Sequence, residues 1–202
     1  KKNSLISKII GLITTKNQKV CSGTVYLGEL LKHHAELRWG KAPRSTVIDI
    51  STDLSLYSRR KTNINELDKI VIHYGGQLGE SHDAFAIVKC VKEIYDSELS
   101  KFISFSFYVS GSKANYLRKK LQGYPIRVNH TINSYEWREK TKDFHIGLVT
   151  LMPYSSTVCL PSKTYGMMAS GLAILSISPV WSDLSQLIKK LNAGWVINNS
   201  PY

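Results

Sequence analysis

The stretch Leu160-Pro-Ser-Lys-Thr-Tyr-Gly-Met-Met-Ala-Ser-Gly171, followed by the apolar run Leu172-Ala-Ile-Leu-Ser-Ile177, is the most informative part of this chain. It predicts a loop, a short helix, a glycine stop and a buried strand. Ser162 suits the cap of that helix. Lys163 and Thr164 then fall in its first turn, where backbone N–H groups and the helix dipole favour an anion. The segment is therefore a candidate phosphate site, although an ordinary capped helix explains it equally well.

From residue 69 onward, apolar runs typical of strands alternate with amphipathic runs typical of helices. Strands are predicted over 69–74, 102–109, 126–128, 144–151, 172–177 and 194–197, and helices over 83–96, 113–122, 134–142, 162–170 and 182–191. The glycines at 75 and 76 are expected to end the first strand. This alternation implies right-handed crossovers and a doubly wound parallel sheet, a Rossmann-like α/β fold.

Residues 1–66 follow a different pattern. A short helix is predicted over 5–13, a strand within 19–25, a helix over 27–39, a strand over 47–50 and a polar linker over 57–66. One such unit cannot cover both faces of its own sheet. We therefore interpret 1–66 as the remnant of a second domain with its linker, and 67–202 as the main domain.

Composition restricts the possible classes. The 202 residues are 43% hydrophobic and 21% charged, which is typical of a globular domain, and no apolar run reaches the about 18 residues that span a bilayer. Cys21, Cys90 and Cys159 are far apart and form no C-x-x-C pair. This spacing argues against a disulfide framework or a zinc site. We expect a cytoplasmic chain with reduced thiols and no metal.

A formal net charge of +12 predicts an anionic partner. Nucleic acid, phospholipid head groups and phosphorylated small molecules all satisfy that condition. The lysines and arginines are scattered in small groups, and no known nucleic-acid-binding motif frames them. Peripheral attraction to a membrane that carries anionic lipids explains a scattered pattern at least as well.

Three loops are predicted at the edge of the sheet where ligands of open parallel sheets bind, beyond the carboxyl ends of the strands. They are 74–83, which contains three glycines, 109–113, and the helix start at 160–164. Glycines permit close approach of a ligand to the backbone, and Ser81 or Asp83 can cap the helix that follows. Each loop alone is a weak signal, but together they favour a ligand with a phosphate group.

Histidines and tryptophans elsewhere are first interpreted as packing residues. His73 and His145 lie within predicted strands, so we expect them in the core or in a cleft wall. The tryptophans at 39, 137, 181 and 195 are isolated aromatic residues, which usually pack in the interior. No Ser-His-Asp arrangement is recognisable, and no catalytic residue is assigned.

Taken together, the segments 70–79, 107–111, 143–151, 160–174 and 193–197 resemble the nucleotide-sugar-binding half of GT-B glycosyltransferases, specifically the family 4 group. The closest match is 160–174, which is similar to the family segment PSK followed by E-x-M-A-x-G-x-P-I/V. The resemblance covers residues 69–199. More faintly it covers 20–56, which is similar to the last helix of the acceptor domain and the crossing point that ends at Asp53.

The resemblance implies where a sugar nucleotide would bind. Its diphosphate would lie between the 76–79 loop and the start of the 162–170 helix, and its base against the loop after the third strand. The implied phosphate-binding residues are Gly76, Gln77, Gly79, His82, Lys113, Ser162, Lys163 and Thr164, and the implied base- and ribose-binding residues are Asn129, His130, Thr131, Ile132 and Gly166.

This chain departs from the family pattern at charged positions. The first loop often carries Arg and Lys in the family, whereas Gln77 and His82 stand there in this chain. The glutamate that usually grips the ribose falls on Gly166. Either Lys163 and Lys113 supply the phosphate-binding charge, or donor binding is altered.

The resemblance further implies a glycosyltransferase that moves a hexose or N-acetylhexosamine from a UDP-sugar to a sugar or lipid-linked acceptor. Bacterial surface polysaccharide or lipopolysaccharide synthesis at the inner face of the cytoplasmic membrane would suit the basic surface. Displacement at the anomeric carbon would proceed with retention and without a metal or a further cofactor, and without nucleic acid as a partner. The leaving diphosphate would be stabilised electrostatically.

Two alternatives stay open. The first is a basic α/β module that binds nucleic acid without catalysis. The second is a sugar-nucleotide epimerase with GT-B architecture, which would need carboxylates such as Glu80, Asp83 and Glu136. Because GT-B catalysis needs two facing domains, we expect this chain to be part of an enzyme, binding a sugar nucleotide but transferring little or no sugar by itself.

Overall fold

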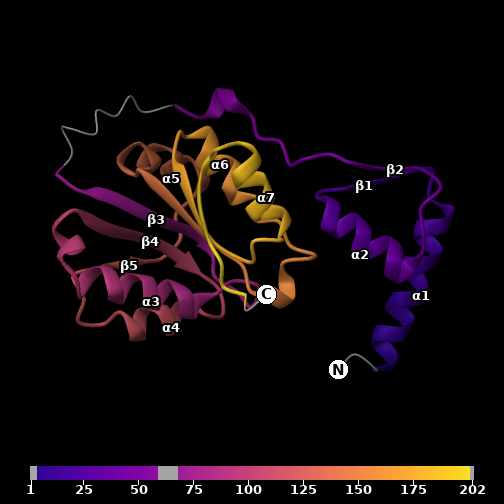
Figure 1. The fold of residues 1–202 in the computed structure, drawn as a ribbon, viewed down its shortest axis with the longest axis horizontal. Coiled ribbons are helices and arrows are strands. Elements are labelled where there is room, and N and C mark those ends of the chain that lie inside the picture. Colours follow the sequence, from indigo (N-terminus) through magenta and orange to yellow (C-terminus); the bar gives the residue numbers. More distant parts are fainter. Residues whose placement is uncertain (1–3, 59–67, 201–202) are drawn as a thin grey trace.

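The computed structural model describes residues 4–58 and 68–200. Its main body is built on a six-stranded, all-parallel sheet with the strand order β5-β4-β3-β6-β7-β8 (Figure 1). The strands are β3 (Ile70–Gln77), β4 (Ile103–Ser110), β5 (Val128–Asn129), β6 (Ile146–Thr150), β7 (Ala173–Ile177) and β8 (Gly194–Ile197). The prediction of a doubly wound parallel sheet is confirmed.

Helices cover both faces of this sheet (Figure 1). On one face lie α3 (Ala84–Tyr95) and α4 (Ala114–Lys120); on the other lie α5 (Ser134–Lys140), α6 (Lys163–Ala169) and α7 (Asp183–Lys190). Single 3-10 turns occupy Leu54–Leu56, Glu98–Lys101, Thr141–Asp143 and Pro153–Ser155. Asp83 caps α3 as expected, because its carboxylate accepts the Ala86 N–H at 2.9 Å.

Two apolar cores hold the three layers together. Alternate residues of β3 and β4 point to the layer of α3 and α4, as the two-residue period of a strand dictates. That core contains Ile72, Tyr74, Phe105, Phe107, Ile87 and Leu117. The opposite core, under α6 and α7, contains Val149, Leu151, Met167, Ile174, Leu184 and Ile188.

The prediction that Gly75 and Gly76 end the first strand is wrong. Parallel pairing of β3 with β4 continues through both glycines to Gln77, which lies opposite Ser110. The strand turns only at Leu78, whose N–H donates to the Ser110 carbonyl at 2.7 Å. Long-range pairing with β4 therefore overrides the local tendency of glycine to break a strand, and Gly76 and Gln77 belong to β3 rather than to a loop.

The N-terminal unit consists of α1 (Leu5–Val20), β1 (Thr24–Tyr26), α2 (Glu29–Trp39) and β2 (Ser45–Val47), and it lies beyond α7 (Figure 1). The two strands pair in parallel as a separate sheet. The first helix is longer than predicted, because 14–20 continue it. The second strand ends at Val47, although the Ile48 N–H still donates to the Tyr26 carbonyl at 2.9 Å. The Gln18 amide fixes the helix end by donating to Tyr26 Oη and to the Gly40 carbonyl, both at 2.7 Å. Most of the predicted 57–66 linker lies outside the described residues.

The carboxylate of Asp183 connects this unit to the main body. Asp183, the first residue of α7, accepts the N–H of Leu30 at 3.2 and 3.1 Å and the N–H of Leu31 at 3.4 Å. These are free N–H groups of the first turn of α2, whose cap residue Gly28 has no side chain to offer. A Cβ at Gly28 would lie 2.2 Å from Asp183 Oδ2. Asp183 thus caps α2 from across the contact.

Candidate functional site

A cavity of about 430 Å³ lies at the carboxyl end of β3. The chain leaves β3 to build β4 and β5 on one side of the sheet, and later adds β6, β7 and β8 on the other side. Such a reversal of strand order is where open α/β sheets bind ligands. The walls come from the end of β3, the loop and helix after β5, the start of α6 and the segment 50–57.

The cavity combines aromatic rings with hydroxyl groups and one lysine. The rings belong to Tyr57, Tyr108, Trp137 and Tyr165, and the hydroxyl groups to Ser51, Thr52, Thr131, Ser134 and Ser162. Flat apolar surfaces with a few polar groups are typical of sites for small molecules. The lysine is Lys163, so an aromatic ligand with a negative charge matches the lining best.

Lys163 is an unusual cation. Its ammonium nitrogen is buried, and in the described part of the chain it has no hydrogen-bond partner. It lies 3.8 Å from the centre of the Tyr74 ring, which attracts a cation but replaces only part of its hydration. Burial lowers the pKa of Lys163 to about 7. An anion in contact with the amine would offset this cost.

The helix start contributes less than its sequence predicted. Ser162 has helical backbone angles and makes no side-chain cap. The N–H groups of Thr164 and Tyr165 donate to the carbonyls of Pro161 and Ser162, each at 3.1 Å, so the backbone already engages them. The Thr164 side chain is fully buried below the helix. Of this segment, the cavity is lined by Ser162, Lys163, Tyr165 and Gly166.

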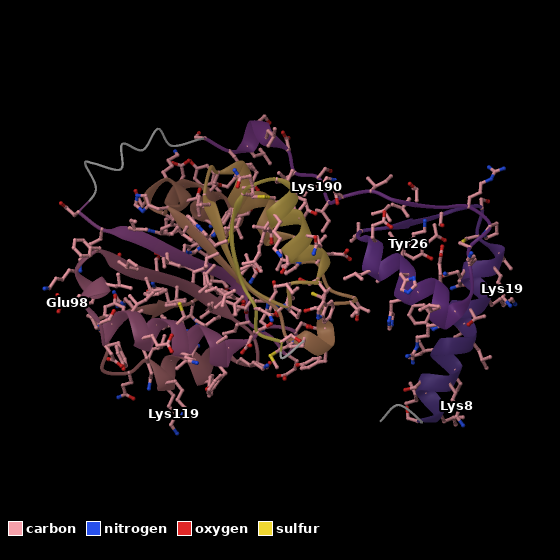
Figure 2. All side chains as sticks on the ribbon, in the orientation of Figure 1. Lys8, Lys19, Tyr26, Glu98, Lys119 and Lys190 are labelled. Carbon is pink, nitrogen blue, oxygen red and sulfur yellow. The ribbon has the colours of Figure 1, made fainter. Side chains whose placement is uncertain are left out.

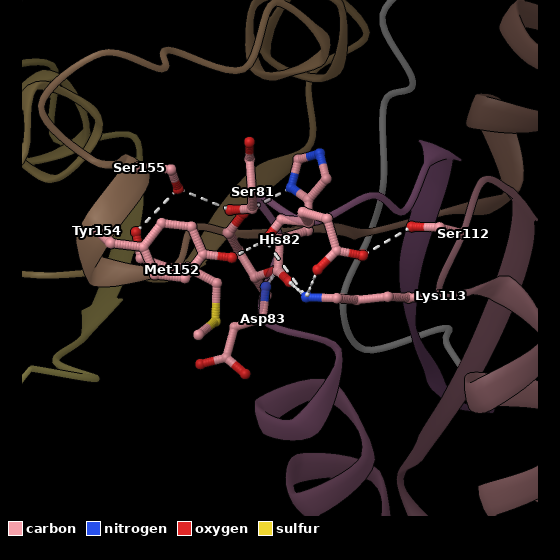
Figure 3. Close-up of polar contacts among 10 residues, drawn as sticks. Ser81, His82, Asp83, Ser112, Lys113, Met152, Tyr154 and Ser155 are labelled. Carbon is pink, nitrogen blue, oxygen red and sulfur yellow. Dashed lines mark hydrogen bonds and ion pairs between the residues drawn. The ribbon is translucent and has the colours of Figure 1, made fainter. Parts of the chain in front are cut away.

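Lys113 binds to the loop that follows β3 (Figure 3). Its ammonium lies 3.5 Å from the Glu80 carboxylate and donates to the carbonyls of Glu80 and His82 at 3.3 and 3.2 Å. On the other side of this loop, the Ser155 hydroxyl donates to the Ser81 carbonyl at 3.0 Å. These contacts fix residues 80–82 and leave Lys113 outside the cavity lining.

His82 belongs to the same loop. Its Nδ1 bonds to the carbonyl of Thr150, the last residue of β6, at 2.8 Å. Burial, together with the positive charge of Lys163, lowers the pKa of His82 to about 4. A neutral imidazole at neutral pH does not supply positive charge to a phosphate, and His82 does not line the cavity.

The structure therefore brings together only part of the expected site. The predicted residues that line the cavity are Gly76, Ser162, Lys163, Thr131, Ile132 and Gly166. The predicted residues outside its lining are Gln77, Gly79, His82, Lys113, Thr164, Asn129 and His130. Asn129 pairs with Tyr108 as part of β5, and His130 faces the Arg118 guanidinium, with 3.3 Å between the nitrogens.

The region around Gly166, which was expected to contact a ribose, is shaped by two rings. A Cβ at this position would lie 3.0 Å from Tyr57 Oη and 3.6 Å from Trp137. Tyr57 comes from the segment that leads away from the N-terminal unit. Any larger side chain at 166 would have to displace the Tyr57 hydroxyl, so Gly166 leaves room for these rings in the cavity wall.

Sequence reasoning missed the aromatic part of the cavity. Tyr57, Tyr108, Trp137 and Tyr165 are far apart in the sequence, and no spacing rule connects them. The one available signal was position: Trp137 and Tyr165 lie in helices that follow the carboxyl ends of strands, on the same edge as the predicted loops. His73, by contrast, has no exposed surface, which confirms the prediction that it packs in the core.

The remaining observations concern metal ligands, membrane-spanning helices and similarity to known proteins. Within residues 4–58 and 68–200, no three His, Cys, Asp or Glu side chains are placed to hold a metal ion. Among the helices of the same residues, none combines the length and the apolar character needed to cross a bilayer. Comparison with protein-family models gives no match, and comparison with curated proteins gives none either.

Proposed function

We propose that the chain is the nucleotide-sugar-binding half of a GT-B glycosyltransferase of the family 4 type, and that its cavity holds a UDP-sugar or a closely related donor. One observation carries this proposal. A buried lysine with no hydrogen-bond partner among residues 4–58 and 68–200 meets several aromatic rings in one cavity, at the strand-order reversal of a parallel sheet. That combination suits a nucleoside diphosphate, which has a flat base and a charged pyrophosphate.

The residues have separable roles in this proposal. Lys163 faces the diphosphate and stabilises the charge that grows on it as the bond to the sugar breaks. Gly76 has no side chain, and a Cβ there would meet no atom within 4 Å, which allows a phosphate to approach the backbone of β3. Trp137 and Tyr108 offer ring surfaces to the base. The acceptor hydroxyl attacks the anomeric carbon, and the nucleoside diphosphate leaves.

The carboxylates argue against the epimerase alternative. Proton transfer at a sugar carbon needs a carboxylate or another base at the reacting atom. Glu80, Asp83 and Glu136 were the candidates, and none of them lines the cavity. Glu80 is paired with Lys113, and Asp83 caps α3.

Isothermal titration calorimetry with UDP, GDP, UDP-N-acetylglucosamine, uridine and a short RNA tests the proposal. We expect the diphosphates to bind at least about tenfold more tightly than uridine, since only they reach a buried cation. Binding of RNA alone, with an affinity that falls steeply with salt, would instead support a nucleic-acid-binding module. Failure of every nucleotide to bind at millimolar concentration would refute the donor-site assignment.

We further propose that α1 lies on an anionic membrane surface. Seven of its apolar side chains are exposed: Leu5, Ile6, Ile9, Ile10, Leu12, Ile13 and Val20. The same helix carries three lysines and no acidic residue, and Figure 2 labels Lys8 and Lys19 on it. An apolar stripe bordered by lysines is typical of helices that lie in the membrane interface.

Co-sedimentation with lipid vesicles tests this part of the proposal. We expect binding to phosphatidylglycerol vesicles and little binding to phosphatidylcholine vesicles, with each lysine near the surface worth about 1 kcal/mol. Ile9→Glu should abolish binding, whereas Phe85→Glu, a control at an exposed apolar residue of α3, should not. Equal binding of both variants, or none by the unmodified chain, would show that α1 does not contact lipid.

A further inference from the structure

One wall of the cavity is formed by the loop and helix that follow β5, and this wall is weakly attached to the sheet. Its residues come from the loop 131–133 and from α5, and none of the seven residues of α5 is fully buried. Trp137 is the residue of α5 that packs against the core beneath α6 and α7. The position of this wall therefore depends on how the indole of Trp137 is held.

The indole is held by a buried histidine. Trp137 Nε1–H donates to His73 Nε2 at 2.9 Å. His73 lies on β3 and has no exposed surface, and its Nδ1 bonds to the Ser106 carbonyl at 3.0 Å. Because a carbonyl only accepts and an indole N–H only donates, the imidazole must carry its proton on Nδ1. One neutral tautomer satisfies both partners.

The orientation of the His73 imidazole is fixed as well. The imidazole stacks on the Phe144 ring, with 4.1 Å between the ring centres and 12° between the planes. Burial lowers the pKa of His73 to about 3, so the ring stays neutral at neutral pH and its Nε2 lone pair stays available to the indole. His73 itself is not part of the cavity lining.

The neighbouring glycine leaves space for this hydrogen bond. A Cβ at Gly75 would lie 2.6 Å from His73 Nε2 and 2.9 Å from Trp137 Nε1, closer than real Cβ contacts allow. On the other side, a Cβ at Gly166 would lie 3.6 Å from the same indole. Trp137 is thus seated between two positions without side chains, one on β3 and one on α6.

We propose that His73 is a positioning residue: through its hydrogen bond to Trp137 it sets the cavity wall on which the base of the nucleotide lies. The choice of ligand rests on the proposed function, whereas the role of His73 toward Trp137 rests on the contacts alone. His73 touches no ligand in this arrangement, so its whole effect on binding passes through the indole.

A double-mutant cycle tests the proposal. In the unmodified chain, His73→Phe should weaken UDP binding about tenfold, since the indole N–H loses its buried acceptor. In a Trp137→Phe background the same substitution should change UDP affinity by less than about twofold, because the partner is already gone. An undiminished effect of His73→Phe in that background would refute the proposal.

The indole N–H provides a readout that needs no ligand. In a ¹⁵N–¹H spectrum, the Trp137 indole signal should shift and its hydrogen exchange should accelerate in His73→Phe. An unchanged signal would overturn the role of His73 even if no nucleotide binds. If no nucleotide binds and the signal still moves, the proposed function fails while the positioning role stands.

Two further variants separate positioning from general damage. His145→Phe is the matched control, because His145 also bonds to backbone through Nδ1, which accepts the Val71 N–H at 2.9 Å near the amino ends of the strands. It should lower stability without changing UDP affinity or the Trp137 signal. Should His73→Phe fail to fold, Gly75→Ala keeps His73 and should still move the Trp137 signal. An unmoved signal in Gly75→Ala, or a His145→Phe effect on the indole as large as that of His73→Phe, would refute the proposal.

Discussion

Replacing Lys163 with methionine should make the protein more stable. The pKa of Lys163 falls from 10.5 to about 7 on folding. Since one pKa unit corresponds to about 1.4 kcal/mol, carrying the charge costs the folded state about 5 kcal/mol relative to the unfolded chain. Methionine keeps most of the apolar stem and removes the charge. Allowing for the lost contact with Tyr74, we expect a gain of about 1–4 kcal/mol at pH 7.

The same substitution should impair binding. If the ammonium donates to the pyrophosphate, its loss should weaken UDP about ten- to hundredfold, the usual range for a charge-assisted hydrogen bond. Binding of uridine should change by less than about twofold, because a nucleoside has no group that reaches the amine. Stability and affinity thus move in opposite directions, as they do when a binding residue is held at a cost to the fold.

Thermal unfolding checks the predicted gain in stability, and calorimetry checks the predicted loss of UDP affinity. For a chain of this size we expect the Tm of Lys163→Met to rise by at least about 3 °C. Lys189→Met, a control at an exposed lysine near the end of α7, should change neither Tm nor UDP affinity. A lower Tm for Lys163→Met would refute the idea of a costly buried charge. Equal losses for UDP and uridine would refute the phosphate contact.

Three further predictions follow from contacts and charges. Between pH 7 and pH 10 the unfolded chain keeps the Lys163 proton that the folded chain has released. Urea denaturation should therefore show the free energy of unfolding rising with pH by up to about 1.4 kcal/mol per pH unit relative to Lys163→Met. A difference between the two proteins that does not change with pH would contradict the lowered pKa. Lys113→Met should cost about 1 kcal/mol of stability, measured by thermal unfolding, because it removes the contacts with Glu80 and His82. Calorimetry should show UDP affinity within about twofold of the unmodified chain. A large loss of affinity would show that Lys113 contacts the phosphate. Asp183→Ala removes the cap on α2, so limited proteolysis should cut the segment 48–58 faster while nucleotide binding persists. An unchanged cleavage rate would show that Asp183 does not hold the N-terminal unit.

Sequence patterns predicted the main body well because its elements obey local rules. The apolar runs of two-residue and 3.6-residue period identify the strands and helices from β3 to β8. Asp83 and the glycine at 171 mark helix ends by mechanisms that depend only on neighbouring residues. Parallel pairing then follows from the alternation itself.

Errors arose where distant residues decide local structure. Gly75 and Gly76 stay in β3 because β4 lies beside them, and Ser162 makes no cap because the backbone of its own turn binds the N–H groups. The cavity is walled by the segment 50–57, the end of β3, the loop and helix after β5, and the start of α6, which lie apart in the sequence. Sequence patterns therefore identified small or charged members such as Gly76 and Lys163 but not the aromatic rings between them. Trp137 and its support by His73 depend on the packing of α5 against β3, which no local pattern encodes.

A structure of the chain with bound UDP tests most directly whether this cavity is a nucleotide-sugar site. The expected result has a pyrophosphate oxygen about 3 Å from Lys163 Nζ and the uracil ring beside Trp137. UDP bound at another surface, such as the loop held by Lys113, would contradict the assignment. So would a cavity that stays empty at UDP concentrations that saturate binding in solution.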